Sequence, residues 1–459
     1  MQTPEDAVDL IVIGTGGAAM AAGIEARSRG RTVLLVEHGP LGGTCLNVGC
    51  VPSKNLLAAA GQRHHALTNR FPGVATSADG VDVPALMAQK RDLIAGMRQA
   101  KYADVAAAHG FPVRHGHARF VDGRTLEVDG ERLRAPAYVV ATGAAPHVPE
   151  LPGLDQVAFL TSTTGMEQPD LPGSMVIVGA GYVGLEQAQL WAHLGARVTL
   201  VGRFAPHSEP EVAEVLRGVF ADDGIAVVED RAVAVTRTVD GVLVRTEGGP
   251  DVRGQRLLMA TGRSAATGGL GLTAAGIDTD ERGFVTVDGQ QRTTNPRVFA
   301  AGDVCGAPQY VYVAAQTGRV AAAGALGQPT TLDYRGLPGV TFTTPQIASA
   351  GLTEQQALAA GHACDCRVLG GQDIPRALVN RDTRSALKIV ADAGTGKILG
   401  VHAVLDGAGD VILAATYAIK FGLTVDDLAD TWAPYLTMSE ALRITAGLFR
   451  SDKPTSCCA

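Results

Sequence analysis

The chain has 459 residues, of which 46% are hydrophobic and 19% charged, a composition typical of a globular protein with two or three domains. Its formal net charge of −7 argues against nucleic acid as the main partner, because nucleic-acid binding needs a basic surface. No apolar run is long enough to cross a membrane, and the first residues lack the basic start of a secretion signal. We therefore expect a cytoplasmic protein, in which a pair of reduced cysteines is catalytic or metal-binding rather than structural.

The first elements of the chain form a strand–turn–helix–strand unit of the kind that binds a dinucleotide. An apolar strand over 9–13 leads into a GxGxxA turn, where Gly14 allows the tight turn and Gly16 lets a pyrophosphate approach. Ala19 lets the following helix pack closely on the strand, and the helix N-terminus faces the phosphates. The next strand ends at Glu37, whose carboxylate can accept hydrogen bonds from ribose hydroxyls.

A glycine-rich segment with two cysteines, GGTCLNVGCVPSK, follows this unit. Cys45 and Cys50 are close enough in sequence to reach each other where a turn enters a helix. A thiolate near a helix N-terminus has a lowered pKa and is reactive. Lys54 lies about one helical turn further on, where it can face the same site. The alternative, two inert core thiols, suits this segment poorly, so we predict a reactive cysteine pair beside the first nucleotide.

The nucleotide-binding pattern then occurs a second time. An apolar strand over 174–178 leads into a second glycine turn, a helix and another strand. The position that matches Glu37 is Gly202, and Arg203 follows it. An acid here would repel a 2′-phosphate, whereas a glycine followed by arginine favours one, so the pattern predicts NADPH. The alternative is that Arg203 is a solvated surface charge. Two dinucleotide sites in one chain predict electron transfer between two cofactors.

The segment GGTCLNVGCVPSK resembles the redox-disulfide segment of the flavoprotein disulfide reductases, the family of glutathione reductase and lipoamide dehydrogenase. The resemblance runs along the whole chain and includes YVVATGAAP at 138–146, LLMATGR at 257–263, RVFAAGDV at 297–304 and TFTTPQIASAGLTE at 341–354. It implies an α/β fold with two Rossmann-like dinucleotide-binding domains, for FAD and NADPH, and a C-terminal α+β dimerisation domain. The implied bounds are 1–150 and 272–335 for the FAD domain, 151–271 for the NADPH domain, and 336–459 for the dimer-interface domain with its Cys-Cys tail.

The resemblance also assigns roles to single residues. Glu186 and Lys54 match an ion pair near the flavin ring, and Tyr182 matches an aromatic residue over the nicotinamide pocket, unless it only packs. Cys50 would be the sulfur nearer the flavin, and Cys45 the more exposed exchange thiol. Asp303 would meet the ribityl chain of the flavin. The implied cofactor-binding residues are Gly14, Gly16, Ala19, Glu37, Gly39, Gly43, Thr44, Lys54, Thr142, Gly143, Ala144, Asp303, Val311, Gly179, Gly181, Gly184, Arg203 and Gly262.

The chain departs from the disulfide reductases at their catalytic acid. In glutathione reductase and lipoamide dehydrogenase this acid is a histidine of the partner subunit, five residues before a glutamate. The glutamate is present here as Glu440, but Tyr435 occupies the histidine position. A phenol with a pKa of about 10 cannot shuttle protons near pH 7 as an imidazole does. We therefore expect poor turnover of ordinary disulfides.

Tyr435 and the C-terminal KPTSCCA, with Cys457 and Cys458, resemble the Hg(II)-reducing branch of this family, as does PRALVNRDTR at 375–384. Thiolates are the strongest protein ligands of the soft ion Hg(II). The resemblance implies a homodimer with an active site shared between subunits, in which the tail takes Hg(II) from small-molecule thiol complexes and passes it to Cys45 and Cys50. NADPH, through FAD, would then reduce it to volatile Hg(0). The implied catalytic residues are Cys45, Cys50, Tyr435, Tyr182, Glu186 and Glu440, and the implied metal ligands are Cys45, Cys50, Cys457 and Cys458.

Three alternatives remain open: a disulfide reductase with an unusual acid, a non-catalytic metal-thiol sensor, and an enzyme for another soft metal or an organomercurial. Three other cysteines are predicted to be structural: Cys364 and Cys366 as ordinary strand-edge thiols rather than an accessory metal site, and Cys305 as a packing residue. The 11 histidines show no ligand-type spacing, and the adjacent His64 and His65 are predicted to be a solvated pair.

Overall fold

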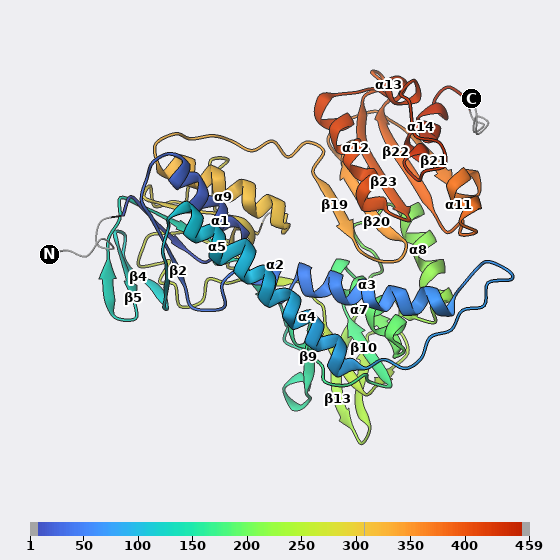
Figure 1. Ribbon diagram of the computed structural model, residues 1–459, viewed down its shortest axis with the longest axis horizontal. Coiled ribbons are helices and arrows are strands. Elements are labelled where there is room, and N and C mark those ends of the chain that lie inside the picture. The colour runs from blue at the N-terminus through green and yellow to red at the C-terminus, as the bar shows by residue number, and fades with distance from the viewer. Residues whose placement is uncertain (1–7, 307, 452–459) are drawn as a thin grey trace.

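The computed structural model describes residues 8–306 and 308–451, which form three domains, each built on a five-stranded sheet (Figure 1). The first domain, blue and gold in Figure 1, lies beside the second, in green, and the third, orange to red, lies above the second. Within the described residues, no helix has the length and apolar character needed to cross a membrane. The architecture confirms the predicted α/β fold with two nucleotide-binding sheets and a further C-terminal domain.

The first domain has a parallel sheet in the order β18-β7-β1-β2-β3. Its central strand β1 is buried on both faces, as expected for a parallel sheet covered by helices. Helices α1 and α9 pack closely, because a Cβ on Gly318 would lie 2.1 Å from the carbonyl oxygen of Ala18. The elements are β1 (Leu10–Ile13), α1 (Gly17–Ser28), β2 (Val33–Glu37), α2 (Gly43–Asn47), α3 (Cys50–Leu67), α4 (Val83–Arg98), the π-helix η1 (Gln99–Ala103), α5 (Asp104–His109), β3 (Val113–His115), β4 (Ala118–Asp122), β5 (Thr125–Val128), β6 (Glu131–Leu133), β7 (Ala137–Val140), β8 (Ala144–Pro146), β17 (Arg263–Ala265), β18 (Val298–Ala300), η3 (Gly302–Cys305) and α9 (Val311–Ala325).

The second domain repeats this design with a parallel sheet in the order β12-β11-β10-β16-β9. A separate antiparallel sheet, β13-β14-β15, lies beside it. The elements are η2 (Leu154–Gln156), β9 (Phe159–Thr161), α6 (Ser162–Gly165), β10 (Ser174–Val178), α7 (Tyr182–Leu194), β11 (Arg197–Val201), α8 (Pro210–Asp222), β12 (Ala226–Val228), β13 (Ala232–Thr238), β14 (Gly241–Thr246), β15 (Val252–Gly254) and β16 (Arg256–Met259).

Helix α3 starts at the cysteine segment of the first domain and extends to lie between the second and third domains (Figure 1). It packs against α7, and its buried Leu56 and Ala60 share one hydrophobic core with Trp191 of the second domain and Ile347 of the third. Helices α3 and α7 therefore run from the centre of the molecule as a packed pair.

The third domain is an antiparallel sheet in the order β19-β20-β23-β22-β21 with helices packed on it. Strand β21 forms one edge of this sheet. The elements are β19 (Pro338–Thr341), β20 (Gln346–Gly351), α10 (Glu354–Ala359), β21 (Cys364–Gly370), η4 (Gly371–Asp373), α11 (Pro375–Val379), β22 (Ala386–Asp392), β23 (Ile398–Leu405), α12 (Ala408–Phe421), α13 (Val425–Ala429) and α14 (Glu440–Gly447).

Candidate active site

The first glycine turn, between β1 and α1, leaves its backbone open to a ligand. Gly14 has a φ of +115°, and a Cβ on it would lie 2.4 Å from the carbonyl oxygen of Ala141, so only glycine fits there. A Cβ on Gly43 would lie 2.6 Å from the Cα of Gly16, so the two backbones meet without side chains between them. The backbone amides at the start of α1 therefore border a space that suits a pyrophosphate.

Two kinds of polar group surround this turn. Some fix the Glu37 carboxylate beside the space that suits a pyrophosphate, and others are buried without a hydrogen-bond partner. The Thr15 hydroxyl donates to Glu37 Oε2 at 2.7 Å, and the Gly39 amide donates to Oε1 at 2.8 Å, which fixes the Glu37 carboxylate at the end of β2. Thr142 Oγ1 and Arg263 Nε are buried and have no hydrogen-bond partner among the described residues. Because buried polar atoms are normally paired, these two atoms fit a polar ligand such as FAD.

The second glycine turn, between β10 and α7, is even tighter. A Cβ on Gly179 would lie 2.2 Å from the carbonyl oxygen of Ala260, and one on Gly184 would lie 1.8 Å from the carbonyl oxygen of Gly179. Gly202, at the end of β11, has a φ of +137°, which disfavours the acidic residue that would repel a 2′-phosphate. Arg203 is exposed at the edge of the same space. These residues fit a nucleotide with a phosphorylated ribose.

The cysteine pair lies where α2 ends and α3 begins. Gly49 brings the two helices together, because a Cβ on it would lie 2.9 Å from the carbonyl oxygen of Thr44. The Cys45 thiol donates a hydrogen bond to the sulfur of Cys50, which raises the pKa of Cys45. The same hydrogen bond, helped by the charge of Lys54, lowers the pKa of Cys50 to about 7. Cys50 is therefore the thiolate of the pair near neutral pH, and Cys45 holds the proton.

Both cysteines line the cavity, but their side chains are exposed to different degrees. Cys50 is exposed and opens into the cavity, whereas Cys45 is half-buried. Cys50 starts α3 at the cavity wall, while Cys45 lies inside the short helix α2. The expectation that Cys50 is the sulfur nearer the flavin and Cys45 the more exposed exchange thiol stays a prediction.

The predicted ion pair between Lys54 and Glu186 is confirmed, with 2.8 Å between Nζ and Oε2. It links α3 to α7 one helical turn beyond Cys50. The Phe342 amide donates to Glu186 Oε1 at 2.9 Å, and Lys54 Nζ lies 4.6 Å from the centre of the Phe342 ring. All three domains thus hold this pair in place, so the ammonium stays close to the cysteines.

One continuous cavity of about 2970 Å³ joins both glycine turns and the cysteine pair. Most of the predicted site residues line it: Gly14, Gly16, Glu37, Gly39, Gly43, Thr44, Cys45, Cys50, Lys54, Thr142, Gly143, Gly179, Gly181, Tyr182, Glu186, Arg203, Gly262, Asp303 and Val311. Three others, Ala19, Ala144 and Gly184, are buried behind its wall, where they allow close packing. Burial raises the pKa of the Asp303 carboxyl, and Arg263 beside it opposes that effect.

Four tyrosines line this cavity, Tyr182, Tyr310, Tyr312 and Tyr334, of which the sequence had indicated only Tyr182. The first three form a cluster. Tyr310 hydrogen-bonds with Tyr182, and its ring stacks on that of Tyr312 with 5.2 Å between centroids. Burial and the neighbouring Tyr310 raise the pKa of Tyr182, so the cluster is neutral at pH 7. Tyr102, in the π-helix η1, does not line the cavity; burial is the main cause that raises its pKa, and the charge of the nearby cysteines raises it further. The motif YVY at 310–312 was the one local signal for this cluster.

Tyr435 and Glu440 are not among the residues that line this cavity. Tyr435 is exposed on the third domain, whereas Glu440 is buried at the start of α14 and pairs with Arg443 at 3.3 Å. Cys457 and Cys458 lie outside the described residues. One chain alone therefore brings together the cysteine pair, the ion pair and both glycine turns, but not Tyr435.

The remaining cysteines and histidines match the predictions in part. Cys364 and Cys366 are half-buried on the edge strand β21, as expected, and Cys305 packs against the core of the first domain. His64 contradicts the prediction of a solvated pair, because only 12% of its side chain is exposed and its ring stacks on His193 with 3.8 Å between centroids. Burial, with His193 as the second cause, lowers the pKa of His64 to about 4. The partner lies far away in sequence, so local spacing could not reveal it.

Comparison with known proteins agrees with this geometry. Residues 8–318 match the family described as pyridine nucleotide-disulphide oxidoreductase. The chain is 53% identical to a mercuric reductase of Streptomyces lividans, with 98% of each chain covered, and 44% identical to one of Bacillus cereus, with 98% of this chain and 73% of that one covered.

Solved structures show the same fold. An HOCl-induced flavoprotein disulfide reductase, RclA from Escherichia coli, matches with a TM-score of 0.85 at 28% identity, over 96% of this chain and 99% of that one. LpdA from Mycobacterium tuberculosis matches with a TM-score of 0.84 at 30% identity, over 96% and 100%. Residues 337–446 match the dimerisation domain of the family, so the chain forms a homodimer. With both parts matched, the chain belongs to the pyridine nucleotide-disulphide oxidoreductase family.

Proposed function

We propose that this chain reduces Hg(II) to Hg(0), using the Cys45–Cys50 pair as the site that holds the ion. As members of its family do, the chain uses FAD and NAD(P)H, which supply the two electrons when bound. The observation that carries the proposal is the thiol pair itself, which shares one proton beside Lys54 in the cavity that joins both glycine turns. The mercuric reductases among its relatives support the choice of ion.

The unequal protonation of the two sulfurs suits stepwise capture of Hg(II) from a complex with two small thiolates. The Cys50 thiolate forms the first Hg–S bond and displaces one small thiolate. Cys45 forms the second bond, and its proton leaves with the second small molecule as a thiol. Addition of two electrons to the captured ion breaks both Hg–S bonds, releases Hg(0) and leaves both cysteines as thiolates. Cys45 then regains a proton.

The ion pair keeps a positive charge near sulfurs that become negative. Lys54 stabilises the Cys50 thiolate before capture and both thiolates after release of the metal. Glu186 fixes the position of the ammonium through a 2.8 Å contact, and the backbone of the third domain holds Glu186 in turn. Both are positioning groups for the cysteine chemistry.

Tyr435 and the tail cysteines are proposed to act on the partner's cavity. The exposed position of Tyr435 on the third domain, away from its own chain's cavity, supports a site shared between subunits. Cys457 and Cys458 would accept Hg(II) from small-molecule thiol complexes and exchange it with Cys45 and Cys50 of the partner subunit. The thiols must stay reduced for this, which places the reaction in a cytoplasm-like compartment.

Replacing Cys457 and Cys458 together by serine is expected to lower turnover of Hg(II) bound to bulky thiols more than turnover of Hg(II) bound to small ones. Small complexes can reach Cys45 and Cys50 directly, whereas bulky ones depend on the tail. The measurement is kcat/KM for Hg(0) release with a bulky peptide thiol and with 2-mercaptoethanol. Equal losses with both would contradict delivery by the tail.

Arg203→Ala is expected to raise the KM for NADPH by about tenfold and to leave the KM for NADH nearly unchanged, because a charge-assisted hydrogen bond to the 2′-phosphate is lost. Steady-state kinetics with each nucleotide measure this. Arg237→Ala is the matched control, since Arg237 is exposed in the same domain but does not line the cavity. An equal change for both nucleotides would show that Arg203 does not read the phosphate.

The experiment that tests the main proposal follows loss of mercury from an anaerobic mixture of holoenzyme, NADPH, Hg(II) and excess small thiol. Continued release of volatile Hg(0) supports it. Tight binding of Hg(II) without release would overturn it in favour of a metal-thiol sensor. Turnover of glutathione disulfide or lipoamide without Hg(0) release would overturn it in favour of a disulfide reductase.

A further inference from the structure

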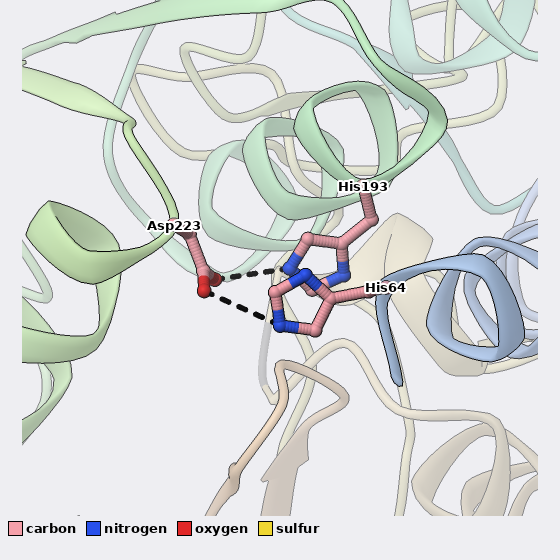
Figure 2. Close-up of side chains that lie close together, drawn as sticks. All are labelled: His64, His193 and Asp223. Carbon is pink, nitrogen blue, oxygen red and sulfur yellow. Dashed lines mark hydrogen bonds and ion pairs between the residues drawn. The ribbon is translucent and has the colours of Figure 1, made fainter. Parts of the chain in front are cut away.

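Two histidines and an aspartate from three separate segments meet at the far end of the α3–α7 pair from the cysteines. His64 lies near the end of α3, His193 near the end of α7, and Asp223 directly after α8. Figure 2 shows both imidazole rings directed at the carboxylate of Asp223. His193 Nε2 lies 2.9 Å from Asp223 Oδ2, and His64 Nε2 lies 3.4 Å from Oδ1. Each carboxylate oxygen thus faces a different ring.

The spacing of these donor atoms fits a transition-metal ion. The ligand atoms of the three residues all lie within 4.8 Å of one another. In a tetrahedral zinc site with ligand bonds of about 2.0–2.1 Å, neighbouring donor atoms are about 3.3 Å apart. The two nitrogen–oxygen separations bracket that value. Two imidazoles and one carboxylate, with a fourth position left for water, form a ligand set that zinc sites use.

The surroundings support the carboxylate as a fixed ligand. Gln189 Nε2 donates to Asp223 Oδ2 at 2.8 Å and also to the carbonyl oxygen of Thr344 at 3.0 Å, so a residue outside the ligand set holds Asp223 in place. The side chains of Asp223 and His193 are 2% and 3% exposed. Two arginines lie near the cluster. Arg384 is paired with Asp382 and Asp222, which limits its repulsion of a bound ion, and Arg63 donates to the carbonyl oxygen of His193 at 2.9 Å.

We propose that His64, His193 and Asp223 form a Zn(II) site that fastens α3 of the first domain to α7 and α8 of the second. The stacked rings must tilt apart so that both nitrogens point at one ion, and the ring torsions of histidine are broad enough to allow it. The nitrogen and oxygen ligands of this site are harder Lewis bases than the cysteine thiolates. Hg(II), a soft ion, therefore binds the cysteines, and the site stays available for Zn(II). The site does not depend on the proposed Hg(II) reduction.

The test compares Zn(II) bound by the FAD-loaded enzyme and by its His64→Ala and Asp223→Asn variants after dialysis against a fixed free Zn(II) concentration. His65→Ala is the matched control, because His65 is exposed beside His64 and outside the cluster. Only the dimeric, FAD-containing fraction is analysed, so that misfolded protein does not enter the count. We expect each ligand variant to hold one Zn(II) fewer per chain than the wild type and the control.

X-ray absorption at the zinc edge separates this site from cysteine-bound zinc. The wild type should show a shell of nitrogen and oxygen ligands at about 2.0–2.1 Å, and the His64→Ala variant should retain only sulfur at about 2.3 Å. The thermal midpoint should rise more with Zn(II) in the wild type than in that variant, which keeps only the sulfur-bound zinc. Equal zinc content in all four proteins, or sulfur ligands alone in the wild type, would overturn the proposal.

Discussion

Replacing Cys50 by serine is expected to lower the rate of Hg(0) release by at least about 10³-fold, because a neutral hydroxyl is neither a thiolate nucleophile nor a strong ligand for Hg(II). Cys45→Ser is expected to be comparably damaging, since capture then stops after one Hg–S bond. The anaerobic assay of volatile mercury measures both losses. Cys364→Ser is the matched control, because Cys364 is a half-buried thiol on the edge strand β21 and does not line the cavity.

An alanine variant of Cys45 tests why Cys50 is the thiolate. The hydrogen bond from Cys45 is the largest cause of its lowered pKa of about 7, and Lys54 is a smaller one. The thiolate fraction increases as pH rises through the pKa, so alkylation of Cys50 by iodoacetamide should show a midpoint near pH 7 in the reduced wild type. In Cys45→Ala, which removes the hydrogen-bond donor that a serine would keep, the midpoint should move to higher pH, as read from the Cys50 peptide by mass spectrometry. An unmoved midpoint would show that the thiol pair does not set the reactivity of Cys50.

Most of the residues that the sequence predicted for the cofactor side of the site line one cavity, because their signals are local. The tight turn between a strand and a helix requires glycine at a fixed position, such as Gly14, so the residue type itself and its neighbours in sequence identify the turn. The cysteine segment also contains its own helix start, so Cys45, Cys50 and Lys54 could be placed together from spacing alone. The ion pair of Lys54 with Glu186 spans two domains, and the family resemblance, not the spacing, gave it. The proposed domain limits at 150, 271 and 335 stay predictions.

The groups that the sequence missed are those whose members meet only after folding. His64 and His193 come from different domains and become neighbours because α3 packs on α7. Tyr310 joins Tyr182 because the start of α9 faces the start of α7 across the cavity. Nothing in local periodicity marks such pairs, since each residue alone reads as an ordinary surface or packing residue.

Lys388 is a further residue that the sequence did not single out, and Lys388→Met is expected to lower the free energy of unfolding by about 3–5 kcal/mol. Its ammonium is buried between the second and third domains, with side-chain exposure of only 3%. It lies 3.0 Å from Glu209, 2.9 Å from Glu211 and 2.7 Å from Glu354. Removing the ammonium leaves the buried Glu209 carboxylate without its counter-ion. Urea unfolding of the variant and the wild type measures the loss.

The pH dependence of that loss follows from the pKa shifts. Burial alone would lower the pKa of Lys388, but hydrogen bonds to the three carboxylates raise it. The contribution of Lys388 to the free energy of unfolding is therefore complete below its pKa in the unfolded chain, about 10.4, and is lost only as pH rises through its pKa in the folded protein. The hydrogen bond from Lys388 lowers the pKa of Glu354. The stability that the Glu354 carboxylate contributes is therefore present above about pH 4.3 and is lost as pH falls through its pKa in the folded protein. The difference between variant and wild type should therefore be largest between about pH 5 and 10 and should narrow in acid.

Two further variants separate an unpaired buried charge from simple loss of packing. Lys397→Met, at an exposed position directly before β23, should leave stability within about 0.5 kcal/mol of the wild type. Adding Glu209→Gln to Lys388→Met should recover part of the lost stability, because the glutamine side chain is uncharged and no longer needs a counter-ion. If the double variant were less stable than Lys388→Met, the loss would come from packing, and the charge cluster would not be what joins the second and third domains.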